Sequence, residues 1–252
     1  MKTLKVLSAL LGYPKPELLA AAAELKAALK AESVLKKQPL DGVLRLIDQL
    51  GQSDLYDAQE RYILLFDRTR SLSLHLFEHV HGESRDRGQA MVNLLKVYED
   101  AGYTPTASEL PDYLPLFLEF AATRAPQDAI ELIGEPGHVF AALRERLAKR
   151  NSPYEAVFAA LAALSQAKLD KVALAALRAE PDPEPDDLAA LDAAWAEEEV
   201  TFGPGSAPGA CGKGGLSDRL RQALWPVPGG EPGPGAKPRE VATHRNIPGP
   251  GV

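Results

Sequence analysis

The sequence predicts an all-α protein, a single compact multi-helix bundle that continues into a Gly/Pro-rich tail. Apolar residues recur three to four positions apart through most of the chain, which is the spacing of one face of a helix. Ala, Leu, Glu and Lys dominate there, whereas the β-branched residues typical of strands are few. After Phe202, Gly and Pro make up 21 of the last 50 residues, without a collagen period. We therefore expect a helical domain over residues 1–202 and a disordered tail over residues 203–252.

The first element expected is a short helix within "MKTLKVLSALLGYPKPELL". Lys5 interrupts its apolar run and no small-x-small cleavage pattern follows, so a secretory signal is not indicated. Six further apolar stripes predict helices, and we interpret Gly51 and Gly102 as stops after the second and the fourth of them. The stripes run over residues 18–29, 40–50, 62–66, 91–98, 117–120 and 140–147.

Two more helices are expected toward the end of the domain. In "SPYEAVFAALAALSQA", Ser152 is the expected N-cap, Pro153 the first helical residue and Glu155 the end of a capping box. After the Pro-rich joint "PDPEP", the stretch "DDLAALDAAWAEEE" is also helically spaced. Within the tail, "LSDRLRQALWP" predicts a short helix near residues 216–225.

Charge and composition exclude several classes of function. The net charge is −7 and the sequence shows no basic stripe, so a nucleic-acid partner is not expected. An acidic domain favours a cationic partner, although acidity can also serve solubility alone. Cys211 is the only cysteine, which excludes an internal disulfide and a cysteine-ligated metal cluster. No apolar run reaches the roughly 18–20 residues of a membrane span. We expect a cytoplasmic protein that is not inserted in the membrane.

The stretch "HLFEHVHGE" suggests a metal site at first sight. His75, Glu78 and His79 have the His-x-x-Glu-His spacing of inverted zincin peptidases, in which two imidazoles bind zinc. The preceding residues alternate between apolar and polar, Gly82 ends the segment early, and a third ligand is not evident. Histidines that fill a helix–helix contact are far commoner, so the zinc peptidase is kept only as an alternative.

The next stretch, "ESRDRGQAMVNLL", predicts a helix whose positive N-terminal end suits Asp86. Arg85 and Arg87 oppose the helix dipole there, so each should have a carboxylate partner. Glu78 and Glu83 are close in sequence, and the carboxylates of a bound protein are the other option. The planar guanidinium group suits either role because it forms paired hydrogen bonds with a carboxylate.

The stretch "ELPDYLPLFLEF" contains two prolines four residues apart. We expect Pro111 in the first turn of a helix and Pro115 inside it, where a proline removes a backbone hydrogen bond. Glu109, Asp112 and Tyr113 would then surround the opened backbone. Such a polar, irregular turn beside an aromatic-rich helix predicts the rim of a peptide-binding groove.

Four stretches together resemble the NarJ-type assembly chaperones of respiratory nitrate reductase, within the wider redox-enzyme maturation chaperones. They are "ERYILLFDRTRSLSLHLFEHVHGESRDRGQAMVNLL", "ELPDYLPLFLEF", "SPYEAVFAAL" and "LDAAWAEEEVTFGPG". The resemblance runs from about Met1 to Gly205. One departure is Glu199, where the family pattern has proline.

The resemblance implies an all-helical fold without catalysis of its own. It implies a partner, the N-terminal segment of the apo nitrate reductase alpha subunit, held while the molybdenum cofactor is inserted and membrane docking is delayed. Cofactor biosynthesis proteins are further expected partners, no cofactor stays bound to the chaperone, and another molybdoenzyme client is the alternative. The implied client-binding residues are His75, Phe77, Glu78, His79, Arg85, Arg87, Glu109, Pro111, Asp112 and Tyr113. Protonation of His75 or His79 is expected to change client affinity between about pH 6 and 7.5.

Overall fold

Helices account for nearly all of the regular structure in the computed structural model of the chain. It describes residues 1–82, 86–105, 109–165, 169–183, 187 and 189. The α-helices are α1 (Lys2–Leu11), α2 (Pro16–Ala20), α3 (Ala22–Glu32), α4 (Lys37–Gln52), α5 (Leu55–Phe66), α6 (Leu76–His81), α7 (Asp86–Asp100), α8 (Leu114–Thr123), α9 (Pro126–Gly134), α10 (Gly137–Lys149), α11 (Glu155–Ser165) and α12 (Lys171–Ala179). A 3₁₀ turn, η1 (Arg70–Leu72), precedes α6. The predicted all-α class is confirmed.

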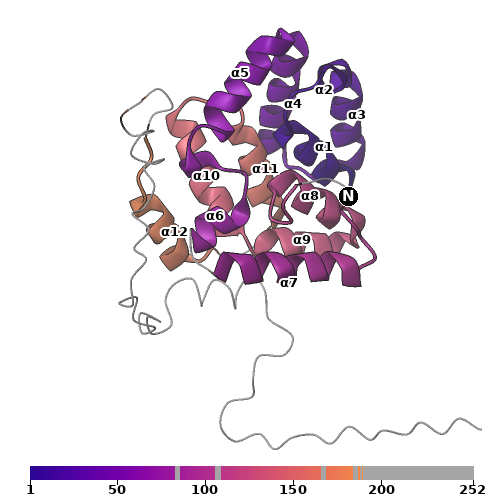
Figure 1. The fold of residues 1–252 in the computed structure, drawn as a ribbon. Helices are drawn as coiled ribbons and strands as arrows, with labels where there is room; N and C mark the ends of the chain where they lie inside the picture. Colours follow the sequence, from indigo (N-terminus) through magenta and orange to yellow (C-terminus); the bar gives the residue numbers. More distant parts are fainter. Residues whose placement is uncertain (83–85, 106–108, 166–168, 184–186, 188, 190–252) are drawn as a thin grey trace, which may run out of the picture.

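Two helix pairs, α1 with α8 and α10 with α11, make the most extensive contacts among the described helices (Figure 1). Helix α1 lies against α8 and α3, while α11 packs on α10, α4 and α9, and α12 covers α10. Apolar residues from these helices, such as Leu7, Phe117 and Phe158, are completely buried and belong to one continuous core. None of the helices in the described residues is long and apolar enough to cross a lipid bilayer.

Several helix boundaries differ from those predicted. The first stripe is divided between α2 and α3, which meet at Ala21. Gly51 does not end its helix but lies inside α4, where a Cβ atom would come within 2.9 Å of the Ala22 Cβ, so its role is close helix packing. Helices α9 and α12 were not predicted. The predicted last helix and the tail helix fall almost wholly outside the described residues.

The capping box predicted at the start of α11 is wrong. The Ser152 amide donates to the Leu147 carbonyl at 2.9 Å, and the Glu155 carboxylate accepts from Arg144 Nε at 2.6 Å instead. The chain turns tightly between α10 and α11, because Asn151 has a positive φ of 51°. This turn brings the Ser152 amide back to the end of α10, so it is no longer available to the Glu155 side chain.

Buried Arg146 of α10 and Arg150, directly after that helix, hold the segment after α12 against η1. Arg146 donates to the carbonyls of Ser71 and Leu177 at 2.7 and 2.6 Å. Asp182 accepts from Arg150 at 2.6 Å and from the Ser71 hydroxyl at 2.9 Å. These bonds connect three parts of the chain that are far apart in sequence. They fix the backbone of residues 69–73, from which the next segment starts.

Candidate functional site

Two of the stretches that the sequence analysis singled out lie side by side. The Leu76 amide donates to the Asp112 carbonyl at 3.0 Å, and the Leu114 amide donates to the Leu74 carbonyl at 2.8 Å. His75 and Tyr113 thereby form an isolated antiparallel bridge. We call residues 73–81 with residues 109–114 the paired segments.

The carboxylate of Asp112 organises the paired segments from a completely buried position. Its Oδ2 atom accepts from the Phe77 amide at 3.0 Å, and its Oδ1 atom lies 3.2 Å from His75 Nδ1. Helix α6 has no side-chain cap from its own N-cap residue, His75, so Asp112 satisfies one of its free amides from across the chain. The hydrogen bond to Asp112 raises the pKa of His75 above its ordinary value of 6.5, in spite of partial burial.

His79 has a different environment from His75. It is buried, and its Nε2 atom lies 2.8 Å from the Ser73 carbonyl oxygen. Burial lowers the pKa of His79 to about 4, and the positive charge of Arg146 acts in the same direction. The expectation that His79 titrates between pH 6 and 7.5 is therefore wrong, whereas His75 remains a group that can titrate above 6.5.

The geometry explains the His-x-x-Glu-His spacing without a metal. His75 lies before the first turn of α6 and pairs with Asp112, while His79 bonds the Ser73 carbonyl on the buried side. Among the described residues, no group of three or more His, Cys, Asp and Glu side chains is arranged to hold a metal ion. Both imidazoles instead fix the backbone of the paired segments.

An ion pair links α6 to the start of α7. Arg87 donates to the Glu78 carboxylate at 3.0 Å, and both side chains keep about a quarter of their surface exposed. Partial burial would raise the pKa of Glu78, but a hydrogen bond from Ser73 and the charge of Arg87 hold it below its usual value. The predicted carboxylate partner of Arg87 is thus confirmed as Glu78, and Asp86 begins α7 as expected. Arg85 and Glu83 lie outside the described residues.

The two prolines occupy other positions than predicted. Helix α8 begins at Leu114, so Pro115 lies in its first turn, where the missing amide breaks no helix bond. The Pro115 carbonyl accepts from the Ser8 hydroxyl at 2.7 Å. Pro111 lies before the helix, and its carbonyl accepts from the Tyr98 hydroxyl at 2.8 Å. The prediction that Pro115 opens the backbone inside a helix is wrong. Asp112, which was expected to lie around that opened backbone, accepts a hydrogen bond from the Phe77 amide of α6 instead.

Tyr62 of α5 belongs to this site although the sequence analysis assigned it only to an apolar stripe. Its hydroxyl donates to the Leu11 carbonyl at 2.8 Å and lies 3.3 Å from the Tyr113 hydroxyl. The Tyr113 ring in turn lies 5.4 Å from the His75 ring, between centroids. A tyrosine in a helical stripe has no local signal that distinguishes it from a core residue, so only the fold reveals this contact.

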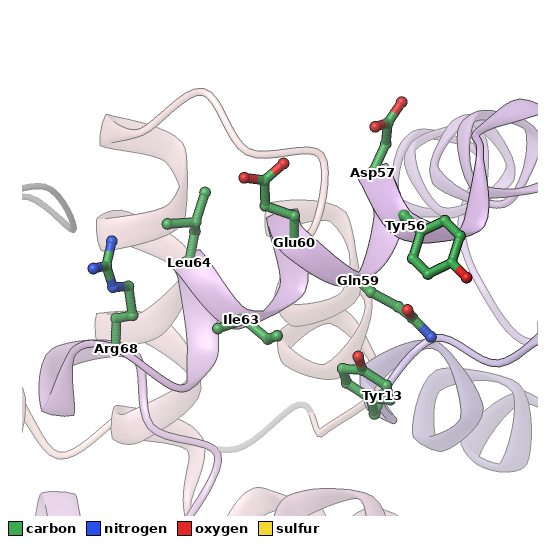
Figure 2. A pocket seen from close by; sticks show the side chains of 8 residues that line it. All are labelled: Tyr13, Tyr56, Asp57, Gln59, Glu60, Ile63, Leu64 and Arg68. Carbon is green, nitrogen blue, oxygen red and sulfur yellow. The ribbon is translucent and has the colours of Figure 1, made fainter.

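A shallow pocket lies along α5, next to Tyr13 (Figure 2). It encloses about 460 Å³ and is lined by one face of α5 together with Tyr13 and Arg68. The Tyr13 ring packs edge-on against the Tyr62 ring, with 5.6 Å between their centroids. Tyr13 lines the pocket, and its contact with Tyr62, which in turn contacts Tyr113, links the pocket to the paired segments.

The site residues implied by the resemblance fall into two groups by exposure. Phe77, His79 and Asp112 are buried and support the backbone of the paired segments. The partly or fully exposed members, which a partner could reach, are His75, Glu78, Arg87, Glu109, Pro111 and Tyr113. The latter group combines an imidazole, an arginine, two acids and an aromatic ring.

The sequence of the chain matches one family model and several known proteins over much of its length. The sequence model of the family described as "nitrate reductase delta subunit" matches residues 15–160. The chain is 39% identical over 222 residues to the nitrate reductase molybdenum cofactor assembly chaperone NarJ of Escherichia coli strain K12, covering 88% of this chain and 92% of that protein. It is 41% identical over 204 residues to the probable chaperone of the same kind, NarW, from that strain, covering 80% and 84%. The probable NarJ of Bacillus subtilis is 32% identical over 163 residues, covering 64% and 88%.

The chain therefore belongs to the nitrate reductase delta subunit family. Within that family it is of the NarJ type, as the identity over most of both chains shows. The paired segments lie inside the part of the chain that the family matches.

Proposed function

We propose that this chain is a chaperone in nitrate reductase maturation that binds the N-terminal segment of the apo alpha, or catalytic, subunit. It holds that segment while the molybdenum cofactor is inserted into the client, and it delays docking of the immature client on the membrane. The chain itself carries out no catalysis, retains no cofactor and acts in the cytoplasm. The names of its relatives as molybdenum cofactor assembly chaperones support this role.

The observation that carries the proposal is that the paired segments contain two kinds of residue: buried ones that support the backbone and exposed ones that a partner can reach. Buried Asp112 and His79 fix the backbone that carries His75 and Glu78 at the surface, and Glu78 in turn holds Arg87 of α7 through their ion pair. These exposed groups therefore have little conformational freedom to lose on binding. A rigid surface binds a flexible segment with a smaller entropic penalty than a mobile one. Partly exposed charged groups of both signs can exchange their mutual contacts for contacts with a partner, which makes binding selective and reversible.

A client segment of this kind is expected to be amphipathic and basic. The acidic domain would accelerate its encounter, since opposite charges steer association. The exposed members of the site, including Glu109 and Tyr113, would then decide its position. Ordering the segment costs about 2–5 kcal/mol of the gross interaction energy, so the affinity stays moderate and release remains feasible.

The experiment that tests the function is co-purification from cells that make the nitrate reductase catalytic subunit, either complete or without its N-terminal segment. The proposal expects the complete subunit to be retained on this chain, in its cofactor-free form, and the shortened one to be lost. Equal retention of both forms would overturn the assigned segment, and retention of neither would overturn the function. A complete catalytic subunit of another molybdoenzyme, made in parallel, distinguishes a different client.

A further inference from the structure

The pocket beside Tyr62 has the chemistry of a binding surface for an amphipathic helix. Tyr13, between α1 and α2, and Tyr56 and Ile63 of α5 line it with exposed fractions of 43%, 78% and 39%. Large apolar side chains that are exposed next to one another mark a surface that a partner can cover. Tyr56 and Ile63 are seven residues apart, so they lie on the same side of α5, two turns from each other. The exposed stripe is therefore as long as a short docked helix needs.

The charges along this pocket are ordered from one end of α5 to the other. Asp57 and Glu60 project from the first half of α5, and Arg68 lies just beyond its C-terminal end (Figure 2). A helix carries a partial positive charge at its N-terminus and a partial negative charge at its C-terminus. A helix docked here is best accommodated with its amino end near the two carboxylates and its carboxyl end near Arg68, that is, parallel to α5.

A chain of side-chain contacts also connects the pocket to the paired segments. Tyr13 contacts Tyr62, whose hydroxyl lies 3.3 Å from that of Tyr113, and Tyr113 contacts His75. Beyond Arg68 the chain runs through η1 directly into the paired segments. Arg68, at one end of the pocket, is thus separated in sequence from the paired segments only by Thr69 and η1, in which Ser71 and Leu72 are buried.

We propose that the α5 pocket, lined by Tyr13, Tyr56, Asp57, Glu60, Ile63 and Arg68, receives the apolar face of the client's leading helix, parallel to α5 and with its amino terminus at Asp57 and Glu60. This inference rests on the proposed function, because the occupant is the same client segment. It assigns to the pocket the apolar contacts and the polarity of the bound helix. The paired segments then hold the part of the client that follows.

The test measures binding of a synthetic peptide with the sequence of the catalytic subunit's N-terminal segment, by fluorescence anisotropy with the full chain. Ile63→Glu should weaken binding about tenfold or more, since a charge then faces the apolar side of the helix. Val172→Glu is the matched control, because Val172 is a β-branched residue with 64% exposure on α12. It should change the affinity less than about twofold. Circular dichroism checks that both variants keep the helical fold.

The polarity is tested with the same peptide carrying an acetylated amino terminus. Acetylation should weaken binding to the unaltered chain severalfold, and it should have little effect on Glu60→Lys, because the interaction it removes is already lost there. The control Glu99→Lys, at an exposed position of α7, should respond to acetylation like the unaltered chain. Equal effects of acetylation on all three proteins would overturn the proposed orientation.

The outcomes separate this inference from the proposed function. If the unaltered chain does not bind the peptide, both are wrong. If it binds, and Arg87→Glu weakens binding while Ile63→Glu does not, the pocket inference is wrong and the function stands. If Ile63→Glu weakens binding and Val172→Glu does not, the pocket is part of the client-binding surface.

Discussion

His75 and Asp112 are 37 residues apart in sequence, yet His75 Nδ1 lies 3.2 Å from the completely buried Oδ1 of Asp112. The second oxygen of the same carboxylate accepts from the Phe77 amide. One buried side chain therefore both caps α6 and holds the imidazole at its start. The stability of the site and the charge at its surface are coupled through this single residue.

Replacing Asp112 should destabilise the fold more than an ordinary change of an acid. Asp112→Ala leaves the Phe77 amide without its acceptor and His75 without its counter-charge, so the free energy of unfolding should fall by about 2–4 kcal/mol. Asp112→Asn keeps one acceptor and should cost about 1–2 kcal/mol. Urea denaturation measures both, with Asp100→Asn at the exposed end of α7 as a control expected within about 0.5 kcal/mol of the unaltered chain. A loss for Asp112→Ala no greater than for the control would contradict the capping role.

The stability that His75 contributes should depend on pH in a defined direction. Its pKa is raised in the folded chain, so the contribution is complete below the ordinary value of 6.5 and is lost as pH rises through the higher folded value. The difference in unfolding free energy between the unaltered chain and His75→Gln should decrease from pH 6 to pH 9. His79 acts in the opposite sense, since its depressed pKa lowers stability as pH falls from 6.5 to about 4. If the difference in unfolding free energy between the unaltered chain and His75→Gln stayed constant with pH, His75 would gain no stabilisation from Asp112.

Arg146 should contribute strongly to the stability of the fold, because it holds the backbone that leads into the site. It is buried and donates to carbonyls from two distant segments, which would lose their donor in Arg146→Met. We expect a loss of about 3 kcal/mol in unfolding free energy. Arg144→Met, two positions away on the same helix and half exposed in a pair with Glu155, should cost no more than about 1 kcal/mol. Chemical denaturation of the two variants compares them directly, and equal losses would exclude a special role for Arg146.

Glu135 should be a position where neutralisation stabilises the chain. Its Oε2 atom is buried and has no hydrogen-bond partner among the described residues, and burial next to Glu131 raises the pKa of Glu135 to about 8. A carboxyl with a raised pKa lowers stability as pH rises from 4.5 toward 8, because the folded state then resists ionisation. Glu135→Gln should therefore gain about 1–2 kcal/mol at pH 8 and little at pH 5. Thermal melts at the two pH values would reveal a pH-independent gain if the burial of charge were not the cause.

The sequence predicted those features of the site that depend on residues close to one another in the chain. Arg87 is an unfavourable cation at the start of a helix, so a carboxylate partner could be predicted from the sequence alone. Glu78 is that partner. The pairing of Asp112 with α6 could not be predicted, because an acid near a helix start normally caps its own helix. The position of Pro115 was misjudged for the same reason, since the true helix start at Leu114 depends on the bridge to residues 74–76. Tyr62 is placed against Tyr113 only by tertiary contacts, among them the hydrogen bond from its hydroxyl to the Leu11 carbonyl.

Isothermal titration calorimetry with the N-terminal peptide of the nitrate reductase catalytic subunit tests the central claim most directly. We predict saturable binding of one peptide per chain, in the micromolar range typical of coupled folding and binding, at about −8 kcal/mol. Arg87→Glu should weaken it while the control Val172→Glu does not. A titration without heat of binding across temperatures, for a chain with its normal helical circular dichroism, would contradict the account.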